Sequence, residues 1–119
     1  MTPTGQLERA VLDVLWESTA PVTAKDVVTA LSARDLAVTT VLTVLDRLGR
    51  KGLVDRERDG RAHRYRAAIS REDYVADLML EALGQAPNRD AALTRFLGGV
   101  STAEAEHLRQ LLREPRPDR

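Results

Sequence analysis

Residues 37–52 read Ala-Val-Thr-Thr-Val-Leu-Thr-Val-Leu-Asp-Arg-Leu-Gly-Arg-Lys-Gly, the most regular pattern in the chain. At about 100° per residue, the apolar side chains gather on one side of a helix. These are Val41, Val44, Leu45 and Leu48. The opposite side carries hydroxyl and charged groups. The many β-branched residues favour a strand locally, but the apolar positions follow a helical period for longer than a usual strand. The pattern therefore predicts an amphipathic helix.

The polar face of this predicted helix carries side chains that can recognise DNA. Threonine can touch a base edge or a thymine methyl, and arginine can bind guanine through two hydrogen bonds or grip a phosphate. We therefore expect the helix to enter the major groove of DNA. Its expected contacts are Thr39, Thr40, Thr43, Arg47 and Arg50. The alternative is an ordinary core helix with a polar outer surface, and the sequence that follows bears on this choice.

Composition bounds the class of protein. The chain has 119 residues, 43% hydrophobic and 30% charged, as in one globular domain with a small addition. Without a long apolar run or a leader, we expect a cytoplasmic protein with no membrane insertion. The lack of cysteine excludes disulfides, thiolate metal sites and cysteine nucleophiles. The formal net charge is zero, but residues 47–66 hold eight basic and three acidic side chains, and such a basic patch suits a groove-binding module.

Two shorter helices are expected before the amphipathic helix. Residues 4–18 carry one apolar stripe, while Leu12 and Trp16 lie on the other side, which predicts a second packing partner. Residues 24–34 form the next helix, and Thr23 with Asp26 resembles a capping box at its start. Two short helices, a tight turn and an amphipathic helix make a helix-turn-helix.

A β-hairpin is expected directly after the amphipathic helix. Gly52 ends that helix as a left-handed cap, and residues 53–67 follow as two strands. Asp59-Gly60 is a strong signal for a type I′ turn, with these two residues as the loop. This loop sets the opposed residues, which are Arg58 with Arg61, Arg56 with His63, Val54 with Tyr65 and, on the other face, Asp55 with Arg64.

A basic hairpin after a helix-turn-helix is typical of a wing, which lies along phosphates or reaches into the minor groove. We expect Arg58, Arg61 and His63 to contact DNA from this wing. The alternative is a solvated arginine-rich hairpin without a partner. Helix and wing occur in the correct order, so residues 1–69 are expected to form a winged helix-turn-helix DNA-binding domain.

Residues 70–119 are expected to form a helical dimerisation region. The fold class is therefore mainly α with a small antiparallel β-wing. The apolar stripes of these helices have too few residues to bury themselves, and segments of this size usually need a partner. Two copies can share a core as a symmetric dimer, whereas the alternative is folding back onto the N-terminal domain. The expected dimer contacts are Val75, Leu78, Met79, Ala82, Leu93, Phe96, Leu97, Leu108, Leu111 and Leu112.

Three segments carry a resemblance to a known family. They are Glu-Arg-Ala-Val-Leu-Asp-Val-Leu-Trp at 8–16, Thr-Thr-Val-Leu-Thr-Val-Leu-Asp-Arg-Leu at 39–48 with Lys-Gly-Leu-Val at 51–54, and Gly-Arg-Ala-His-Arg-Tyr at 60–65. Nearly the whole chain resembles the penicillinase-repressor (BlaI/MecI) family of bacterial winged-helix regulators. The resemblance implies a homodimer that binds a palindromic double-stranded DNA operator and blocks transcription, with the C-terminal helices as the dimer contact.

The resemblance also carries over to particular residues. Thr40, Thr43 and Arg47 match the recognition-helix positions of the family, but Leu42 stands where several members carry a basic residue, so the operator sequence is not carried over. Many members are inactivated when a membrane metalloprotease sensor leads to cleavage before a phenylalanine. The matching bond is Arg95–Phe96, where better-known members have asparagine first. A protease is therefore an implied partner, and the alternative is that the phenylalanine is a plain core aromatic.

Other chemistry finds little support in the sequence. His63 and His107 do not lie in a metal-ligand spacing, and no phosphate loop, serine elbow or HExxH motif occurs. We expect no enzyme activity, no metal and no cofactor. Two further functions are open to a winged helix. One is a protein-interaction module without DNA readout, and the other is a small-molecule-sensing regulator, for which the 3% aromatic content gives little support.

Overall fold

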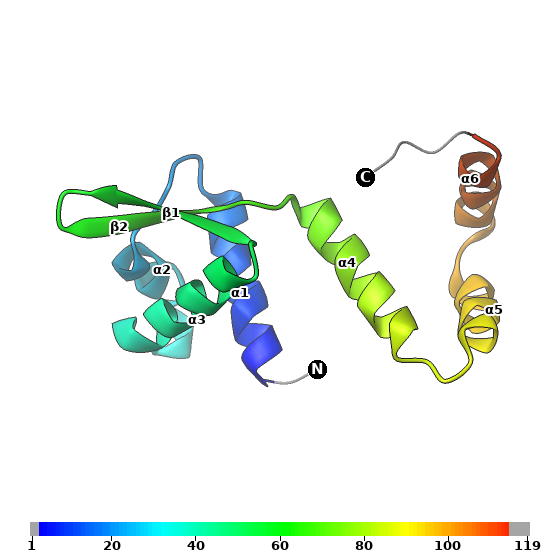
Figure 1. Cartoon of the computed structure of the whole chain (residues 1–119), viewed down its shortest axis with the longest axis horizontal. Coiled ribbons are helices and arrows are strands. Elements are labelled where there is room, and N and C mark those ends of the chain that lie inside the picture. The colour runs from blue at the N-terminus through cyan, green and yellow to red at the C-terminus, as the bar shows by residue number, and fades with distance from the viewer. Residues whose placement is uncertain (1–2, 115–119) are drawn as a thin grey trace. The chain divides into compact units, whose positions relative to one another are not determined.

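The computed structural model describes residues 3–114 of the chain (Figure 1). Its elements are α1 (Pro3–Glu17), α2 (Ala24–Ala30), a 3-10 turn η1 (Ser32–Arg34), α3 (Val38–Arg50), β1 (Val54–Asp59), β2 (Ala62–Ala67), α4 (Arg71–Gly84), α5 (Arg89–Gly99) and α6 (Thr102–Arg113). The predicted fold class, mainly α with a small antiparallel sheet, is confirmed. The chain forms two compact units, Met1–Val75 and Ala76–Arg119, which are described separately.

The core of the first unit lies between its three helices and the base of the hairpin. The predicted apolar face of α3 is buried there, since Val41, Val44, Leu45 and Leu48 are all nearly inaccessible to solvent. α1 contributes Val11 and Leu12, both fully buried. α3 ends as predicted, because Gly52 follows the last turn at φ +78°, a left-handed conformation that suits glycine.

The second helix is shorter than the predicted range 24–34. Its start is as expected: Thr23 Oγ1 accepts a hydrogen bond from the Asp26 N–H at 3.1 Å, and Asp26 Oδ2 accepts one from the Thr23 N–H at 3.0 Å. The α-helix stops at Ala30, and the 3-10 turn η1 follows. Asp35 then takes φ +50°, which ends helical winding before α3.

The hairpin has a different register from the predicted one. Arg58 pairs with His63 rather than Arg61, and Arg56 pairs with Tyr65 rather than His63, so each partner lies two positions later. The loop is Gly60-Arg61 rather than Asp59-Gly60, with Gly60 at φ +65°. Glycine in the first loop position is typical of a type II′ turn. A shift of two positions keeps every side chain on its predicted face.

The corrected pairs run along the whole hairpin. They are Val54 with Ala67, Asp55 with Arg66 rather than Arg64, Arg56 with Tyr65, Glu57 with Arg64, Arg58 with His63, and Asp59 with Ala62. Val54 and Tyr65 are therefore not opposite each other, although both are buried at the hairpin base as expected. An antiparallel bridge attaches this base to the segment before α2, with Tyr65 and Val22 exchanging two backbone hydrogen bonds of 2.7 and 2.9 Å.

An aromatic cluster attaches the start of α4 to α1. The Trp16 indole N–H donates to the Ile69 carbonyl at 2.9 Å, and its ring meets Tyr74 edge-on at 5.5 Å between centroids. The guanidinium of Arg9 lies 5.7 Å from both ring centres, and that of Arg71 lies 5.1 Å from the Trp16 ring. This is the second packing partner predicted for α1, and it includes the first turn of α4 in the first unit.

The second unit has well-capped helices but little interior. Ser101 Oγ accepts from the Glu104 N–H at 3.1 Å, Glu104 accepts from the Ser101 N–H at 2.9 Å, and Asn88 caps α5. None of the described residues 76–114 is buried. The helices therefore have clear local signals for where they begin and end, but no enclosed core among the residues that the structure describes.

The capping box of α2 makes the free energy of unfolding depend on pH. The backbone hydrogen bond from Thr23 lowers the pKa of Asp26 below its ordinary 3.8. A carboxylate with a lowered pKa in the folded state stabilises above its ordinary pKa and loses this effect as the pH falls. The free energy of unfolding of Asp26→Asn should therefore fall less steeply below pH 3.8 than that of the wild type.

Urea unfolding followed by the fluorescence of Trp16, the single tryptophan, measures this difference. Asp55→Asn, on the exposed side of β1, is the matched control and should follow the wild-type profile. Equal pH slopes for Asp26→Asn and the wild type would contradict the role assigned to the capping box.

Candidate nucleic-acid interface

The outer face of α3 presents the predicted recognition residues. Thr39, Thr40, Thr43 and Arg50 are exposed, and their opposite face is buried in the core. Arg47 is turned toward the edge of this face, and its side chain is 42% exposed. The structure therefore brings these side chains together on one surface of one helix, while their contact with DNA stays a prediction.

The hydroxyl of Thr43 is already used within the helix. Its Oγ1 donates to the Thr39 carbonyl at 2.9 Å, a bond to the preceding turn that threonine commonly makes in helices. Since this bond occupies the hydroxyl proton, the side chain can offer DNA only acceptor lone pairs and its methyl group. Thr43 is therefore better suited to a thymine methyl than to a base acceptor.

Two exposed apolar residues of α3 were not among the predicted DNA contacts. Val38 and Leu42 are each 40% exposed, although they are large aliphatic side chains on a helix with a buried side. They lie four residues apart and therefore adjoin on the outer surface. Helical periodicity places Leu42 at the border of the outer face, whereas Val38 lies in line with the buried Val41 and Leu45 and is the first residue of α3. Exposed aliphatic side chains next to threonines give this face many methyl groups, the chemistry that contacts thymine in the major groove.

The charged end of α3 contains internal ion pairs. Arg50 Nη2 lies 3.0 Å from Asp46 Oδ2, one turn earlier on the same helix. At the other edge, Glu8 of α1 accepts from Lys51 Nζ through both oxygens at 3.1 Å and lies 3.9 Å from Arg47 Nη1. Glu8 was also missed, although helical spacing places it in the buried stripe of α1 beside Val11. Of the three cations at this end of the helix, Arg47 has the longest ion-pair distance.

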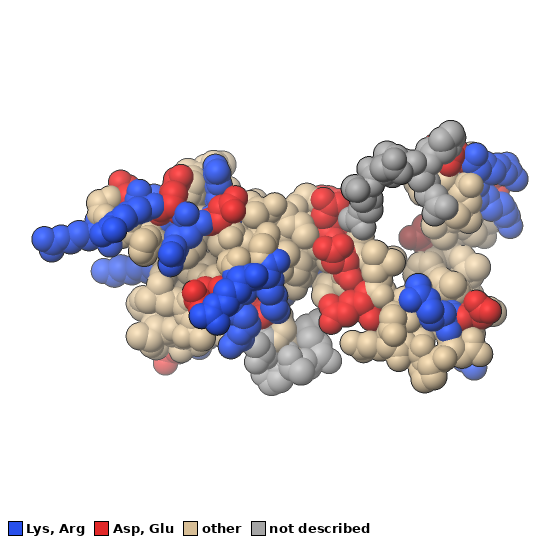
Figure 2. Space-filling model, in the orientation of Figure 1, with Lys and Arg blue, Asp and Glu red and all other residues tan. Residues whose placement is uncertain are grey.

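The hairpin places its cations beside this face. Arg58 and Arg61 are exposed, with Arg58 Nε donating to the Gly60 carbonyl at 3.2 Å. Arg64 Nε binds Asp59 Oδ2 at 2.7 Å, and this hydrogen bond raises the pKa of the Arg64 guanidinium. His63 is half-buried and is the cross-strand partner of Arg58, so both side chains lie on the same face of the hairpin. Figure 2 shows Lys and Arg side chains gathered over the hairpin and near α3.

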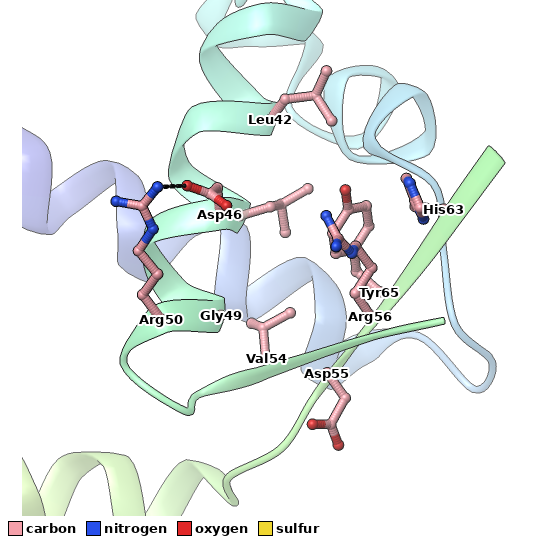
Figure 3. Close-up of a pocket in the computed structure, with 10 residues that line it drawn as sticks. Leu42, Asp46, Gly49, Arg50, Val54, Asp55, Arg56, His63 and Tyr65 are labelled. Atoms are coloured by element: carbon pink, nitrogen blue, oxygen red, sulfur yellow. Dashed lines mark ion pairs between the residues drawn. The ribbon is translucent and has the colours of Figure 1, made fainter. Parts of the chain in front are cut away.

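A groove separates α3 from the hairpin (Figure 3). It has a volume of about 580 Å³, and Leu45, Val54 and Tyr65 form its apolar floor. Figure 3 shows Arg50, bound to Asp46, on the far side of the groove from His63. Within the described residues, His63 Nδ1 is enclosed and has no hydrogen-bond partner. The hairpin is thus spaced from the helix by a cleft, and not packed along its full length.

No helix within residues 3–114 has the length and apolar character needed to cross a membrane. No group of three or more His, Cys, Asp or Glu side chains in that part of the chain is arranged to hold a metal ion.

Comparison with known proteins gives the family. The model of the family described as penicillinase repressor matches residues 4–114, which is most of the chain. This chain belongs to the penicillinase repressor family. The transcriptional regulator BlaI of two Mycobacterium tuberculosis strains is 52% identical over 118 residues, which cover 96% of this chain and 86% of that protein. The resemblance inferred from the sequence motifs is therefore confirmed.

Solved structures of other regulators share the fold. The PcaV transcriptional regulator of Streptomyces coelicolor is 26% identical, with a TM-score of 0.50 over 95% of this chain and 72% of that one. A MarR family transcription regulator gives the same identity and TM-score over 94% of this chain and 68% of that one. Together with family membership, these winged-helix neighbours support a DNA-binding transcriptional regulator, a class of protein that is generally not an enzyme.

The internal hydrogen bond of Thr43 predicts which of its groups would contact DNA. Thr43→Val keeps the outward methyl, and Thr43→Ser removes it but keeps the hydroxyl. On a duplex selected by the wild type from a random-sequence pool, Thr43→Ser should bind about fourfold more weakly, because burying a methyl is worth about 0.8 kcal/mol, while Thr43→Val stays within about twofold. Fluorescence anisotropy measures both affinities. The reverse order, with Thr43→Val the weaker variant, would show that the hydroxyl is the reading group.

Proposed function

We propose that this protein is a dimeric repressor that binds a palindromic operator with α3 in the major groove and the hairpin against the adjacent backbone. The observation that carries this proposal is the outer face of α3, where exposed threonines and aliphatic methyls and the partly exposed Arg47 lie next to a cationic hairpin. An α-helix of this kind fits the major groove, and hairpin arginines suit phosphates or the minor groove. Acting on the bacterial chromosome, the protein would work in the cytoplasm.

The charges assign different roles to helix and hairpin. The long ion-pair distance of 3.9 Å to Glu8 leaves the guanidinium of Arg47 able to form two hydrogen bonds to a guanine. Arg58 and Arg61 are exposed at the hairpin tip, which suits contacts to phosphates that do not depend on sequence. His63, on the same strand face as Arg58, would lie close to the same backbone.

Dimerisation through the second unit is supported by the apolar surface that its helices leave exposed. A hollow of about 600 Å³ between α4 and α5 is lined almost entirely by aliphatic and aromatic side chains. These are Ala76, Met79, Leu80, Ala82, Leu83, Ala92, Leu93 and Phe96. Leu97, Leu111 and Leu112 are also exposed. Contiguous apolar surface of this kind marks an interaction site, and a second copy would bury the same surfaces on both partners.

Proteolytic relief of repression is the remaining part of the proposal. The Arg95–Phe96 bond lies inside α5, and the Phe96 side chain is 45% exposed. A helical bond must open locally before a protease can cleave it, so cleavage would depend on the low stability of a unit in which none of the described residues 76–114 is buried. Cutting there would divide the proposed dimer contacts between two fragments.

The two sets of arginines should respond differently to substitution. Arg58→Ala and Arg61→Ala should weaken binding to the selected duplex and to an unrelated duplex alike, and each should reduce the slope of log affinity against log salt by about 0.9. Arg47→Met should lower affinity for the selected duplex by about tenfold or more, with little change for the unrelated one. Anisotropy titrations at several salt concentrations measure both quantities. If no duplex binds the wild type even at low salt, the protein-interaction module becomes the better explanation.

A charge in the apolar hollow should break the dimer. Met79→Asp places an unpaired carboxylate in the expected contact, which costs more than about 2 kcal/mol and should raise the dimer dissociation constant at least about thirtyfold. Gln85→Asp, which introduces the same side chain at an exposed position outside this hollow, is the matched control. Sedimentation equilibrium measures association, and Trp16 fluorescence checks that the first unit stays folded. A monomeric wild type at micromolar concentration would refute the dimer.

A further inference from the structure

The buried carboxylate of Glu8 faces two cations at the end of α3. Glu8 is only 6% exposed and is the single charged residue among the buried residues described. Lys51 Nζ donates to both of its oxygens at 3.1 Å, while Arg47 Nη1 lies 3.9 Å away. Lys51 therefore supplies the hydrogen bonds, whereas Arg47 lies outside hydrogen-bonding distance of the same anion.

This arrangement divides the two cations between different tasks. A buried carboxylate must be neutralised, because an unpaired charge in a protein interior is strongly unfavourable. Lys51 supplies the neutralising charge and bonds to both carboxylate oxygens, whereas Arg47 Nη1, at 3.9 Å, makes no hydrogen bond to either of them. Arg47 thus feels the attraction of Glu8, which orients its side chain, but makes no bond that would have to break before it reaches another partner.

We propose that Glu8 is a positioning residue for DNA reading: it is held by Lys51 so that Arg47 remains available to the bases. This inference rests on the proposed operator binding. Lys51 has no contact with DNA in this scheme and acts by keeping Glu8 occupied. The sequence preference of Arg47 then depends on two residues that touch neither base nor phosphate.

Removal of Lys51 should have an effect on DNA binding that a simple structural role of Lys51 would not produce. When Lys51 is removed, Arg47 is the one remaining cation within 4 Å of the buried Glu8 carboxylate among the residues that the structure describes. Arg47 should therefore close onto Glu8 and be withdrawn from DNA. Removing the charge of Glu8 in the same protein abolishes that attraction, so the second substitution should reverse the effect of the first.

The test is a double-mutant cycle on the full-length chain. The variants are Lys51→Met, Glu8→Gln, the combination of both, and Arg47→Met as the reference for a lost reading group. Lys25→Met, on the exposed surface of α2, controls for the loss of one lysine charge. Affinity is measured by anisotropy on the selected duplex and on an unrelated duplex, and thermal unfolding is recorded for every variant.

Lys51→Met should lower affinity for the selected duplex about tenfold, to the level of Arg47→Met, and should reduce the preference over unrelated DNA by the same factor. The combined variant should recover to within about threefold of Glu8→Gln. Recovery of affinity without recovery of melting temperature would separate positioning from stability. Lys25→Met should keep the sequence preference of the wild type.

Two outcomes would overturn the inference. If Lys51→Met weakens binding equally on both duplexes and the combined variant is weaker still, then Lys51 is itself a phosphate contact. If Lys51→Met has no effect on affinity, then Glu8 does not compete for Arg47. Both outcomes leave the proposed function intact, because the wild type still prefers its selected duplex. A wild type that binds no duplex would instead refute the proposed function itself.

Discussion

Burial of one side of α3 against α1 and the hairpin base determines what the rest of this surface can do. Four aliphatic residues, Val41, Val44, Leu45 and Leu48, are nearly fully buried. Rotating the helix about its axis would expose them, and each is worth about 1.5–3 kcal/mol when buried. The cost of rotation therefore exceeds the strength of any single contact on the outer face. The polar and methyl-bearing face is directed outward by packing on the opposite side.

The hairpin is positioned by the same core but depends on different interactions. Tyr65 is buried on one strand and exchanges two backbone hydrogen bonds with Val22, so the base of the hairpin is tied to the segment before α2. Beyond this base the strands carry exposed charged side chains, and a groove lies between them and α3. An anchored base with a less constrained tip suits a cationic element whose partner is a charged backbone rather than a defined pocket.

The sequence predicted those features whose signals are local or periodic. The buried face of α3, the capping box at Thr23 and the glycine cap at Gly52 all depend on residues within one or two turns. The hairpin register was wrong because Asp59-Gly60 fits two turn types, and only the position of Gly60 in the loop separates them. The Glu8–Lys51 pair joins residues 43 positions apart, and no local pattern in a single sequence encodes such a contact.

The second unit explains why dimerisation and stability are best treated as one equilibrium in the proposed function. With no buried residue between 76 and 114, the apolar stripes of α4, α5 and α6 gain little from folding alone. A partner that binds only the folded helices stabilises them by mass action, so their folding then depends on protein concentration. Two linked DNA-binding domains also bind two half-sites more tightly than one domain binds either half-site. Loss of the second unit's contacts would therefore lower operator affinity even though every residue on α3 and the hairpin remains in place.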